Sequence, residues 1–342
     1  MFLSFILLLL CIIAQHQHSN RRLCEKRNLT DSVKMIAAIA VVVCHLFTFY
    51  MHHPAWAAES QFGSLSVSIF FFLSGYGLMC SYSLKGKKYL EGFCIHRISK
   101  IIIPLLTAYI IYIPILRLIN HRGGGVIEAI QRLFSSNPLL PYSWYVTEIT
   151  LLYLLFYLVM RFIPRYKLPA LSLAIVFMLA GMLLAGLPHW WINASPCFII
   201  GLWYYKYEHP IMNQMNKVKK QHFITLILLF LCTYRLDIVQ DHIQILSRWR
   251  YTYASFYLVN ILFILLVLYI LQGMNQFINF RIKRNSYYEI YLLQGIIFLL
   301  LGTVVENRLI FFIVAVATTI ISSLGMNWVN QKIIALINIR RK

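Results

Sequence analysis

The sequence predicts an all-α polytopic membrane protein with about ten transmembrane helices and both termini in the cytoplasm. Of its 342 residues, 60% are hydrophobic and only 12% are charged, whereas about a quarter of the residues in a soluble domain are charged. The mean hydropathy is +0.70. So few charges cannot cover the surface of a water-soluble globule of this size. The composition therefore excludes a soluble enzyme, a disordered chain and a fibrous repeat.

Ten apolar runs are candidate membrane spans, because a helix needs about 20 apolar residues to cross a bilayer. The sixth run is short, and the seventh carries Arg235 and Asp237 near its end. No internal repeat and no Pro/Gly/Ser-rich linker divides the chain. We therefore expect one transmembrane domain at 29–338, after an N-terminal segment at 1–28 and before a basic tail at 339–342. The ten runs are 35–52, 64–83, 98–118, 142–163, 168–187, 192–207, 222–239, 251–272, 286–303 and 308–330.

The distribution of basic residues predicts the orientation of these spans. With ten spans, 24 of the 31 Lys and Arg residues fall on one side of the membrane and 7 on the other. Loops rich in Lys and Arg stay in the cytoplasm, so both ends of the chain are expected there. An error of one span would scramble this alternation, so the charge pattern supports the count of ten independently of hydropathy.

The N-terminal run Phe2–Ala14 is apolar but too short for a comfortable span. It resembles a signal-peptide core, yet the basic stretch follows it instead of preceding it. We expect an additional membrane-associated segment, or residues read from an upstream start codon, and in either case no chemistry.

Two other classes of partner are disfavoured. The net charge of +20 could suggest nucleic-acid binding, but the basic residues lie between apolar spans and form no single patch. The seven cysteines are scattered and include no CxxC pair, so neither a metal site nor a disulfide framework is predicted.

The first span carries two ionisable residues, Lys34 and His45, eleven positions apart. At 100° per residue this spacing places both side chains on one helix face, about 16 Å apart along the axis. Lys34 could hold an anion at the cytoplasmic surface, and His45 could act as a general base deeper in the membrane. The alternative is a lysine that extends to the interface and a histidine bonded to a neighbouring helix.

Two further segments carry polar residues near the proposed depth of Lys34 and His45. Ser74 and Gly75, in the second span, would let a neighbouring backbone approach. Arg97 and Lys100, at the start of the third span, share a face and could join Lys34 in a three-cation site for phosphates. Plain helix packing and ordinary cytoplasmic anchoring are the alternatives.

The fourth span begins on the outer side with Trp144, Tyr145 and Glu148. The aromatic pair suits either a membrane-interface belt or stacking on a sugar face. Glu148 could orient His45, bond an acceptor hydroxyl or serve as a structural carboxylate. Glu289, in the ninth span, is a second intramembrane acid that could pair with the basic cluster.

These segments together resemble the acyltransferase-3 family of integral membrane acyltransferases. The matches run in the family's order from residue 29 to about residue 295, and the ten-span prediction agrees with the family's architecture. They are Leu29 and Asp31 with Lys34-x10-His45, Phe71-Phe-Leu-Ser74-Gly75, Arg97-x-x-Lys100 before Pro104, Phe198-Ile-Ile-Gly201, and Ser286-Tyr287 with Tyr291-Leu-Leu-Gln294. Two positions depart from the family pattern. Lys100 replaces a second arginine and loses bidentate phosphate geometry, and Gln294 replaces a frequent histidine, so no proton transfer is expected there.

The resemblance implies transfer of an acyl group, usually acetyl from acetyl-CoA, to a hydroxyl of an extracytoplasmic polysaccharide or its lipid-linked precursor in the bacterial cytoplasmic membrane. Acyl-CoA would be a substrate, and no cofactor would be permanently bound. Lys34, Arg97 and Lys100 would hold the phosphates of coenzyme A, and Ser74 could position the thioester carbonyl. His45 would deprotonate the acceptor or carry the acyl group transiently on nitrogen.

Two readings from other classes remain open. A membrane transporter of an acyl group or glycan intermediate could also have ten spans and a buried histidine, although no repeated halves are visible. A non-catalytic scaffold in glycan assembly would use the same polar residues for packing alone. The sequence leaves open the acceptor sugar, the choice between acetyl and succinyl, and the oligomeric state.

Overall fold

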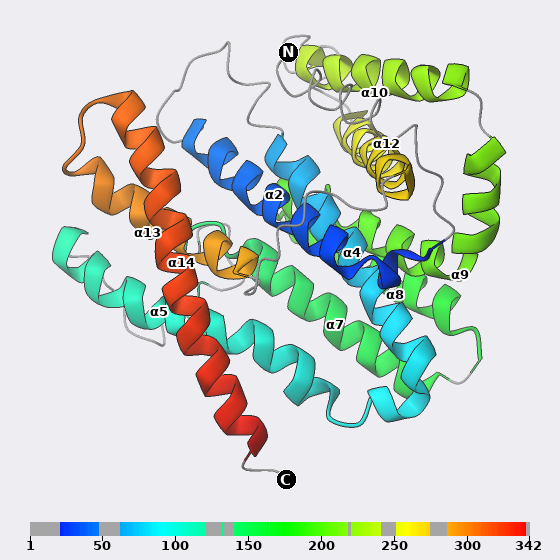
Figure 1. Ribbon diagram of the computed structural model, residues 1–342, viewed down its shortest axis with the longest axis horizontal. Coiled ribbons are helices and arrows are strands. Elements are labelled where there is room, and N and C mark those ends of the chain that lie inside the picture. Colours follow the sequence, from blue (N-terminus) through cyan, green and yellow to red (C-terminus); the bar gives the residue numbers. More distant parts are fainter. Residues whose placement is uncertain are drawn as a thin grey trace. The chain divides into compact units, whose positions relative to one another are not determined.

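The protein is described here by a computed structural model, in which regular structure is helical throughout the described residues (Figure 1). The described ranges are 21–47, 62–120, 132, 138, 140–163, 165–217, 220–240, 251–273 and 286–339. The α-helices are α2 (Arg27–Leu46), α4 (Phe62–Lys85), α5 (Ser99–Asn120), α7 (Trp144–Phe162), α8 (Lys167–Leu184), α9 (Pro196–Lys217), α10 (Lys220–Gln240), α12 (Tyr251–Gly273), α13 (Tyr287–Gly302) and α14 (Arg308–Ile339).

Each of the ten predicted spans overlaps one of these helices. Three boundaries differ clearly, because α2 begins at Arg27 and not near residue 35, α9 extends to Lys217 and α14 extends to Ile339. Among the described residues, six helices are long and apolar enough to cross a membrane, namely α2, α4, α5, α7, α8 and α14. Three shorter apolar helices lie within α10, α12 and α13. The all-helical fold is thus confirmed, whereas the count of ten spans and the orientation of the termini stay predictions.

The chain divides into two compact units. The first unit comprises Met1–Ala37, Ser64–Ser83 and Asn193–Ile282. The second comprises Ala38–Gly63, Leu84–Ile192 and Lys283–Lys342. Helix α2 contributes to both as one uninterrupted helix.

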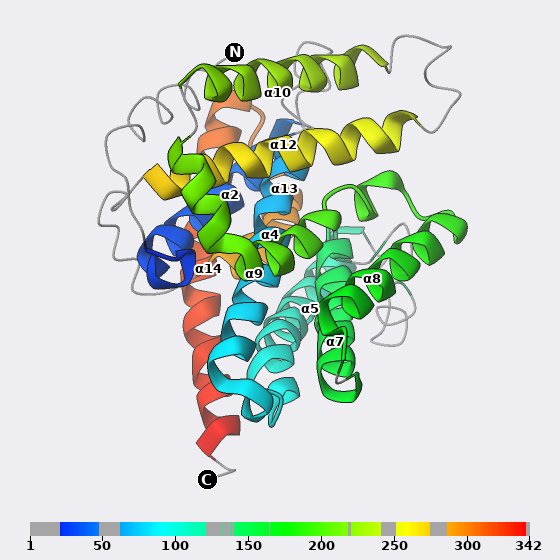
Figure 2. The ribbon, with the colours of Figure 1, turned by 90° about the vertical axis from the view of Figure 1, so that its right-hand side faces the viewer.

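In the first unit α4 and α9 cross at close range. A Cβ atom added to Gly75 would lie 2.2 Å from the carbonyl oxygen of Phe198, and one added to Gly201 would lie 2.1 Å from that of Phe72. Such distances leave no room for a side chain, so both glycines are needed for the two backbones to touch. Two motifs separated by more than a hundred residues therefore form one packing contact. In the same unit α10 and α12 lie side by side (Figure 2).

A buried carboxylate, Glu208, anchors the start of the described chain in the first unit. Helix α9 leaves helical geometry at Tyr207, because Pro210 lacks the N–H that would bond within this turn. Glu208 is only 1% exposed. It accepts hydrogen bonds from the backbone N–H of Leu23 and from the Tyr76 hydroxyl, each at 2.8 Å.

Burial shifts the pKa values of two charged groups in this cluster, Glu208 and Lys26. Burial raises the pKa of the Glu208 carboxyl above its usual value, and the bonds from Leu23 and Tyr76 partly offset this rise. Burial also lowers the pKa of the Lys26 ammonium, and attraction to Glu208 partly offsets this fall. Lys26 donates to the carbonyl oxygen of Leu271 at 3.1 Å. The basic segment before α2 is thus held by buried polar contacts.

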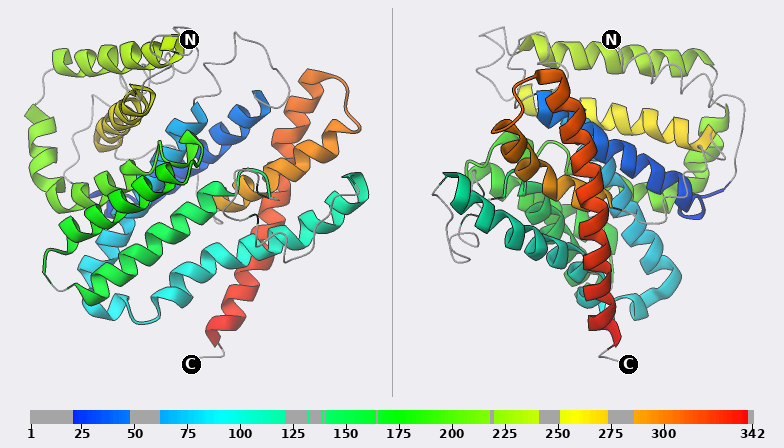
Figure 3. Two further views of the ribbon diagram at one scale, coloured as in Figure 1. Left: turned by 180° about the vertical axis from the view of Figure 1, so that it is seen from behind. Right: turned by 60° about the vertical axis from the view of Figure 1, so that its left-hand side comes forward.

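The second unit packs α5, α13 and α14 against one another, and α7 against α8 (Figure 3). A buried polar chain links the first three helices, because Thr107 donates to Asn330 at 2.9 Å and Asn330 donates to Glu289 at 3.1 Å. Polar groups inside an apolar bundle need such partners. Within the described residues of this unit Glu289 accepts from the Asn330 amide, and its expected pairing with the basic cluster stays a prediction.

The crossing of α4 and α9 predicts opposite outcomes for two neighbouring glycines. Gly75→Ala should lower the free energy of unfolding in detergent by about 1–3 kcal/mol, because the new methyl group meets backbone atoms that cannot move easily. Gly77→Ala is the matched control, since nothing lies within 4 Å of its Cβ position, and alanine favours helix there. Equal stability of the two variants would contradict the crossing.

Candidate functional site

The imidazole of His45 lies near the end of α2 and is held from two directions in the second unit. Its Nδ1 is 2.9 Å from Oε1 of Gln294, on α13. The ring of Tyr142 stacks on it, with centroids 3.7 Å apart and planes 9° from parallel. His45 is half-buried. These contacts restrict rotation of the ring and give it one orientation.

Both partners of His45 are themselves bonded to Tyr291. Gln294 Nε2 donates to the backbone carbonyl of Tyr291 at 3.0 Å, and the Tyr291 hydroxyl donates to the backbone carbonyl of Tyr142. Tyr142 has a left-handed backbone, with φ of 67°. A non-glycine residue adopts this conformation at a cost of about 1–2 kcal/mol, so the turn before α7 is held by its contacts.

A close approach of α5 and the turn before α7 to α13 supports this arrangement. The buried Tyr112 hydroxyl donates to the carbonyl oxygen of Leu292 at 3.1 Å and accepts from the N–H of Ile296 at 2.7 Å. Gly295 makes the approach possible, because a Cβ there would lie 2.9 Å from the Tyr112 oxygen and 3.1 Å from Pro141. A small residue next to Gln294 thus keeps Pro141 close to α13.

The three expected acceptor residues lie on α7 in the same unit as His45. The Tyr145 ring meets the Tyr291 ring edge to face, with centroids 5.3 Å apart. Trp144 is half-buried. Its ring centroid lies 6.3 Å from that of Tyr145 and 6.3 Å from that of Trp191. Glu148 is fully buried on the same helix. Tyr145 and the predicted catalytic histidine are therefore connected through Tyr291 and Gln294.

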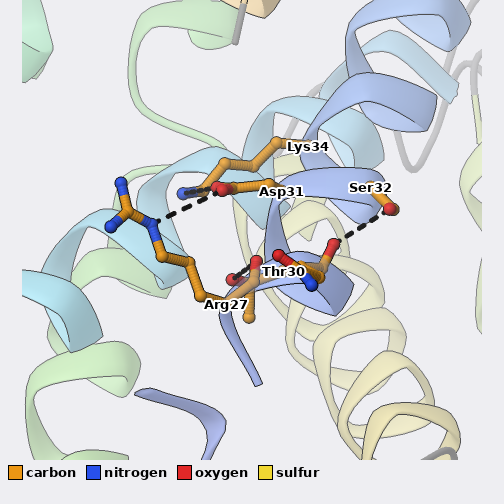
Figure 4. A network of polar contacts seen from close by, with 6 residues as sticks. Arg27, Thr30, Asp31, Ser32 and Lys34 are labelled. Atoms are coloured by element: carbon orange, nitrogen blue, oxygen red, sulfur yellow. Dashed lines mark hydrogen bonds and ion pairs between the residues drawn. The ribbon is translucent and has the colours of Figure 1, made fainter. Parts of the chain in front are cut away.

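Lys34 lies on α2 in the first unit, beside an acidic partner. Asp31 Oδ1 is 3.4 Å from Lys34 Nζ, and Asp31 Oδ2 is 3.7 Å from Arg27 Nε, as Figure 4 shows. The side chains of Lys34 and Asp31 are 23% and 18% exposed, whereas that of Arg27 is 83% exposed. Asp31 therefore orients Lys34. Lys34 and His45 lie on the same continuous helix, as the sequence predicted.

Arg97 and Lys100 lie in the second unit, where α5 begins. Arg97 belongs to a π-helical turn, η5 (Cys94–Ile98), and Lys100 lies in the first turn of α5. Arg97 Nε donates to the Tyr89 hydroxyl at 2.7 Å, and its guanidinium lies 5.6 Å from the centre of the Tyr89 ring. Single π turns are frequent at functional sites. Arg97 is half-buried with a fixed orientation, whereas Lys100 is exposed.

Ser74 is half-buried on α4 in the first unit, one residue before the glycine of the α4–α9 crossing. The expected cation cluster and the expected Ser74–His45 proximity both join residues of different units, so both stay predictions. Within the described residues, no group of three or more His, Cys, Asp or Glu could hold a metal ion.

Sequence reasoning missed three contributors to the histidine site, namely Gln294, Tyr142 and Gly295. It excluded proton transfer at Gln294, but the side chain bonds His45 directly. The signal was present, since a glutamine in an apolar helix needs a partner. The roles of Tyr142 and Gly295 depend on which elements meet, and no local pattern reports that.

Comparison with known proteins adds one finding to this geometry. A family model described as an acyltransferase domain, of the acyltransferase-3 type, matches residues 30–328, which is nearly the whole chain. Comparison with curated proteins and with solved structures gave no match.

The left-handed backbone at Tyr142 predicts an inversion of the usual preference for alanine over glycine. Tyr142→Gly should be more stable than Tyr142→Ala by about 1–2 kcal/mol, because glycine adopts a positive φ without strain. At Tyr153, inside α7, the order should reverse, with alanine more stable by about 1 kcal/mol. Unfolding in detergent would measure both pairs, and the same order at both positions would rule out the strained turn.

Proposed function

Since the chain belongs to the acyltransferase-3 family, we propose that it is a membrane-embedded O-acyltransferase that uses acyl-CoA as donor. The acyl group would be acetyl, and the acceptor a hydroxyl of an extracytoplasmic polysaccharide or its lipid-linked precursor. The observation that carries the proposal is the family match over 30–328, which contains a half-buried histidine with a fixed orientation. The proposed location is the bacterial cytoplasmic membrane.

The proposed chemistry is acyl transfer from a thioester to an oxygen, with His45 as the proton acceptor. As the acceptor oxygen attacks the thioester carbonyl, its proton moves to the imidazole. The C–S bond then breaks, and the coenzyme A thiolate takes the proton from the imidazolium. In the second route the imidazole attacks the thioester carbonyl and carries the acyl group on nitrogen as the C–S bond breaks and the thiolate leaves. The acceptor hydroxyl then attacks this acyl group, and its proton neutralises the thiolate. The first route places the imidazole at the acceptor hydroxyl and the second at the thioester carbonyl, and both yield an O-ester and a thiol.

The donor end of the proposed site is cationic. Lys34, Arg97 and Lys100 would bind the phosphates of coenzyme A, which carries several negative charges. Two features support this assignment: Asp31 orients Lys34, and Tyr89 orients the Arg97 guanidinium. Arginine recognises phosphate through paired N–H groups. Ser74 would position the thioester carbonyl.

The acceptor end of the proposed site is aromatic and acidic. Half-buried Trp144 offers a flat surface for a sugar ring, and Tyr145 lies beside it. The buried carboxylate of Glu148 lies one helical turn from Tyr145 and would accept a hydrogen bond from a sugar hydroxyl. These groups belong to the same unit as His45, which supports an acceptor bound near the imidazole.

The histidine assignment predicts the loss of acyl transfer in one variant. His45→Ala should lower ester formation at least about 100-fold, because general acid–base catalysis contributes that much or more. The measurement is ester formation on the surface glycan, read by NMR in a deletion strain that carries each variant. His209→Ala is the control, since His209 is exposed and bonded to Arg22. Normal O-acylation by His45→Ala would exclude His45 as a catalytic group, and absence of any glycan ester in the parent strain would favour the transporter reading.

The cation assignment predicts a selective defect in donor binding. Arg97→Ala should raise KM for acetyl-CoA at least about tenfold, and the remaining KM should depend less on salt. If Arg97 binds the 3′-phosphate, replacing acetyl-CoA by acetyl-3′-dephospho-CoA should weaken donor binding to the parent protein. The same replacement should weaken donor binding to Arg97→Ala only slightly. Arg161→Ala is the matched control, because the Arg161 guanidinium also lies 5.6 Å from the centre of a tyrosine ring, that of Tyr157. An unchanged KM in Arg97→Ala would reject Arg97 as a phosphate ligand.

A further inference from the structure

The orientation of the Gln294 amide determines which nitrogen of His45 carries hydrogen. An amide has one end that donates and one that only accepts. The donating end of Gln294 is engaged with the carbonyl oxygen of Tyr291 at 3.0 Å, so its oxygen faces His45 Nδ1 at 2.9 Å. Two acceptors cannot share a hydrogen bond, so Nδ1 carries the hydrogen. In a neutral imidazole the lone pair is then on Nε2.

We propose that Gln294 and Tyr142 are positioning residues that hold His45 as the Nδ1–H tautomer, so that Nε2 is the nitrogen that reacts. The inference rests on the proposed acyl transfer and deepens it. Neither residue touches the reacting atoms. Gln294 selects the tautomer, and Tyr142 sets the plane of the ring.

The proton balance of the reaction fits this arrangement. Nε2 takes the proton of the acceptor hydroxyl as the new C–O bond forms. When the C–S bond breaks, Nε2–H returns that proton to the departing thiolate. The hydrogen stays on Nδ1, donated to the Gln294 oxygen, throughout, so the imidazole is restored to the same tautomer after each turnover.

The stacked Tyr142 ring contributes in a second way. While Nε2 holds the transferred proton, the imidazole is cationic, and an aromatic face attracts a cation. The face of the Tyr142 ring lies 3.7 Å from the imidazole centre. This contact exists before the charge develops, so it stabilises the charged state without rearrangement.

Tyr291 couples the two positioning residues. Its backbone carbonyl accepts from the Gln294 amide, and its hydroxyl donates to the carbonyl of Tyr142. One residue therefore sets both the amide orientation and the turn that carries the stacking ring. Gln294 and Tyr142, the two residues that contact His45, are thus both bonded to Tyr291.

The test compares variants that keep or remove the acceptor for Nδ1. Purified full-length protein is assayed with acetyl-CoA and the surface glycan of its host, and kcat and KM are measured separately. Gln294→Met keeps the length of the side chain but accepts no comparable hydrogen bond, so kcat should fall about 100-fold with KM for acetyl-CoA unchanged. Gln294→Glu still accepts from Nδ1–H and should keep kcat within about tenfold of the parent.

A second pair isolates the stacking contact. Tyr142→Phe keeps the aromatic face and should keep kcat, whereas Tyr142→Leu should lower it by about threefold to tenfold. If Gln294→Met fails to fold, Gln294→Asn takes its place, because the shorter amide withdraws the acceptor from Nδ1. Thermal unfolding of each variant identifies those that fold.

The outcomes separate this inference from the proposed function. Equal kcat values for folded Gln294→Met and Gln294→Glu, whether both are normal or both are reduced, would overturn the tautomer assignment. Activity that persists in His45→Ala would instead overturn the proposed role of His45 itself. Loss in Gln294→Met with rescue in Gln294→Glu is the result that the inference expects.

Discussion

The hydrogen bond between His45 and Gln294 is the interaction on which the proposed chemistry depends. An imidazole among apolar helices can take either tautomer and several ring orientations, and only a defined partner selects one. Here the selection comes from α13, whose glutamine is itself oriented by a backbone carbonyl one turn earlier. Gly295 and Tyr112 keep the neighbouring turn close enough for Tyr142 to cover the ring. The histidine is therefore the last member of a chain of constraints that begins in the packing of α5 on α13.

Polar groups elsewhere in the molecule obey the same requirement for partners. In the first unit, Glu208 accepts from Leu23 and Tyr76, so the basic segment before α2 has a defined path. In the second unit, Glu289 is bonded by Asn330. Groups of this kind are costly inside an apolar bundle unless they are bonded. Each of them consequently specifies which helices come together, which apolar contacts alone do less precisely.

Two motifs that appear independent along the chain have one explanation in the first unit. Gly75, in the motif that contains Ser74, packs on the backbone of α9. Gly201, in the motif that begins at Phe198, packs on the backbone of α4. Helices in a membrane associate through close packing of small residues, because lipid offers little hydrophobic drive between them. Ser74 is thereby placed on a rigid crossing, and a residue proposed to position a substrate carbonyl benefits from such a support.

The sequence by itself determined the all-helical class, the approximate limits of ten helices, the family, and a histidine eleven residues after a lysine, because hydrophobic runs and helical spacing are local properties. It placed Trp144, Tyr145 and Glu148 on one helix for the same reason. Only the tertiary structure decided that Gln294 orients His45 and that Tyr142 stacks on it in a left-handed turn. The His45 contacts join segments up to 249 positions apart, and hydrogen-bond geometry over such separations depends on how the helices pack.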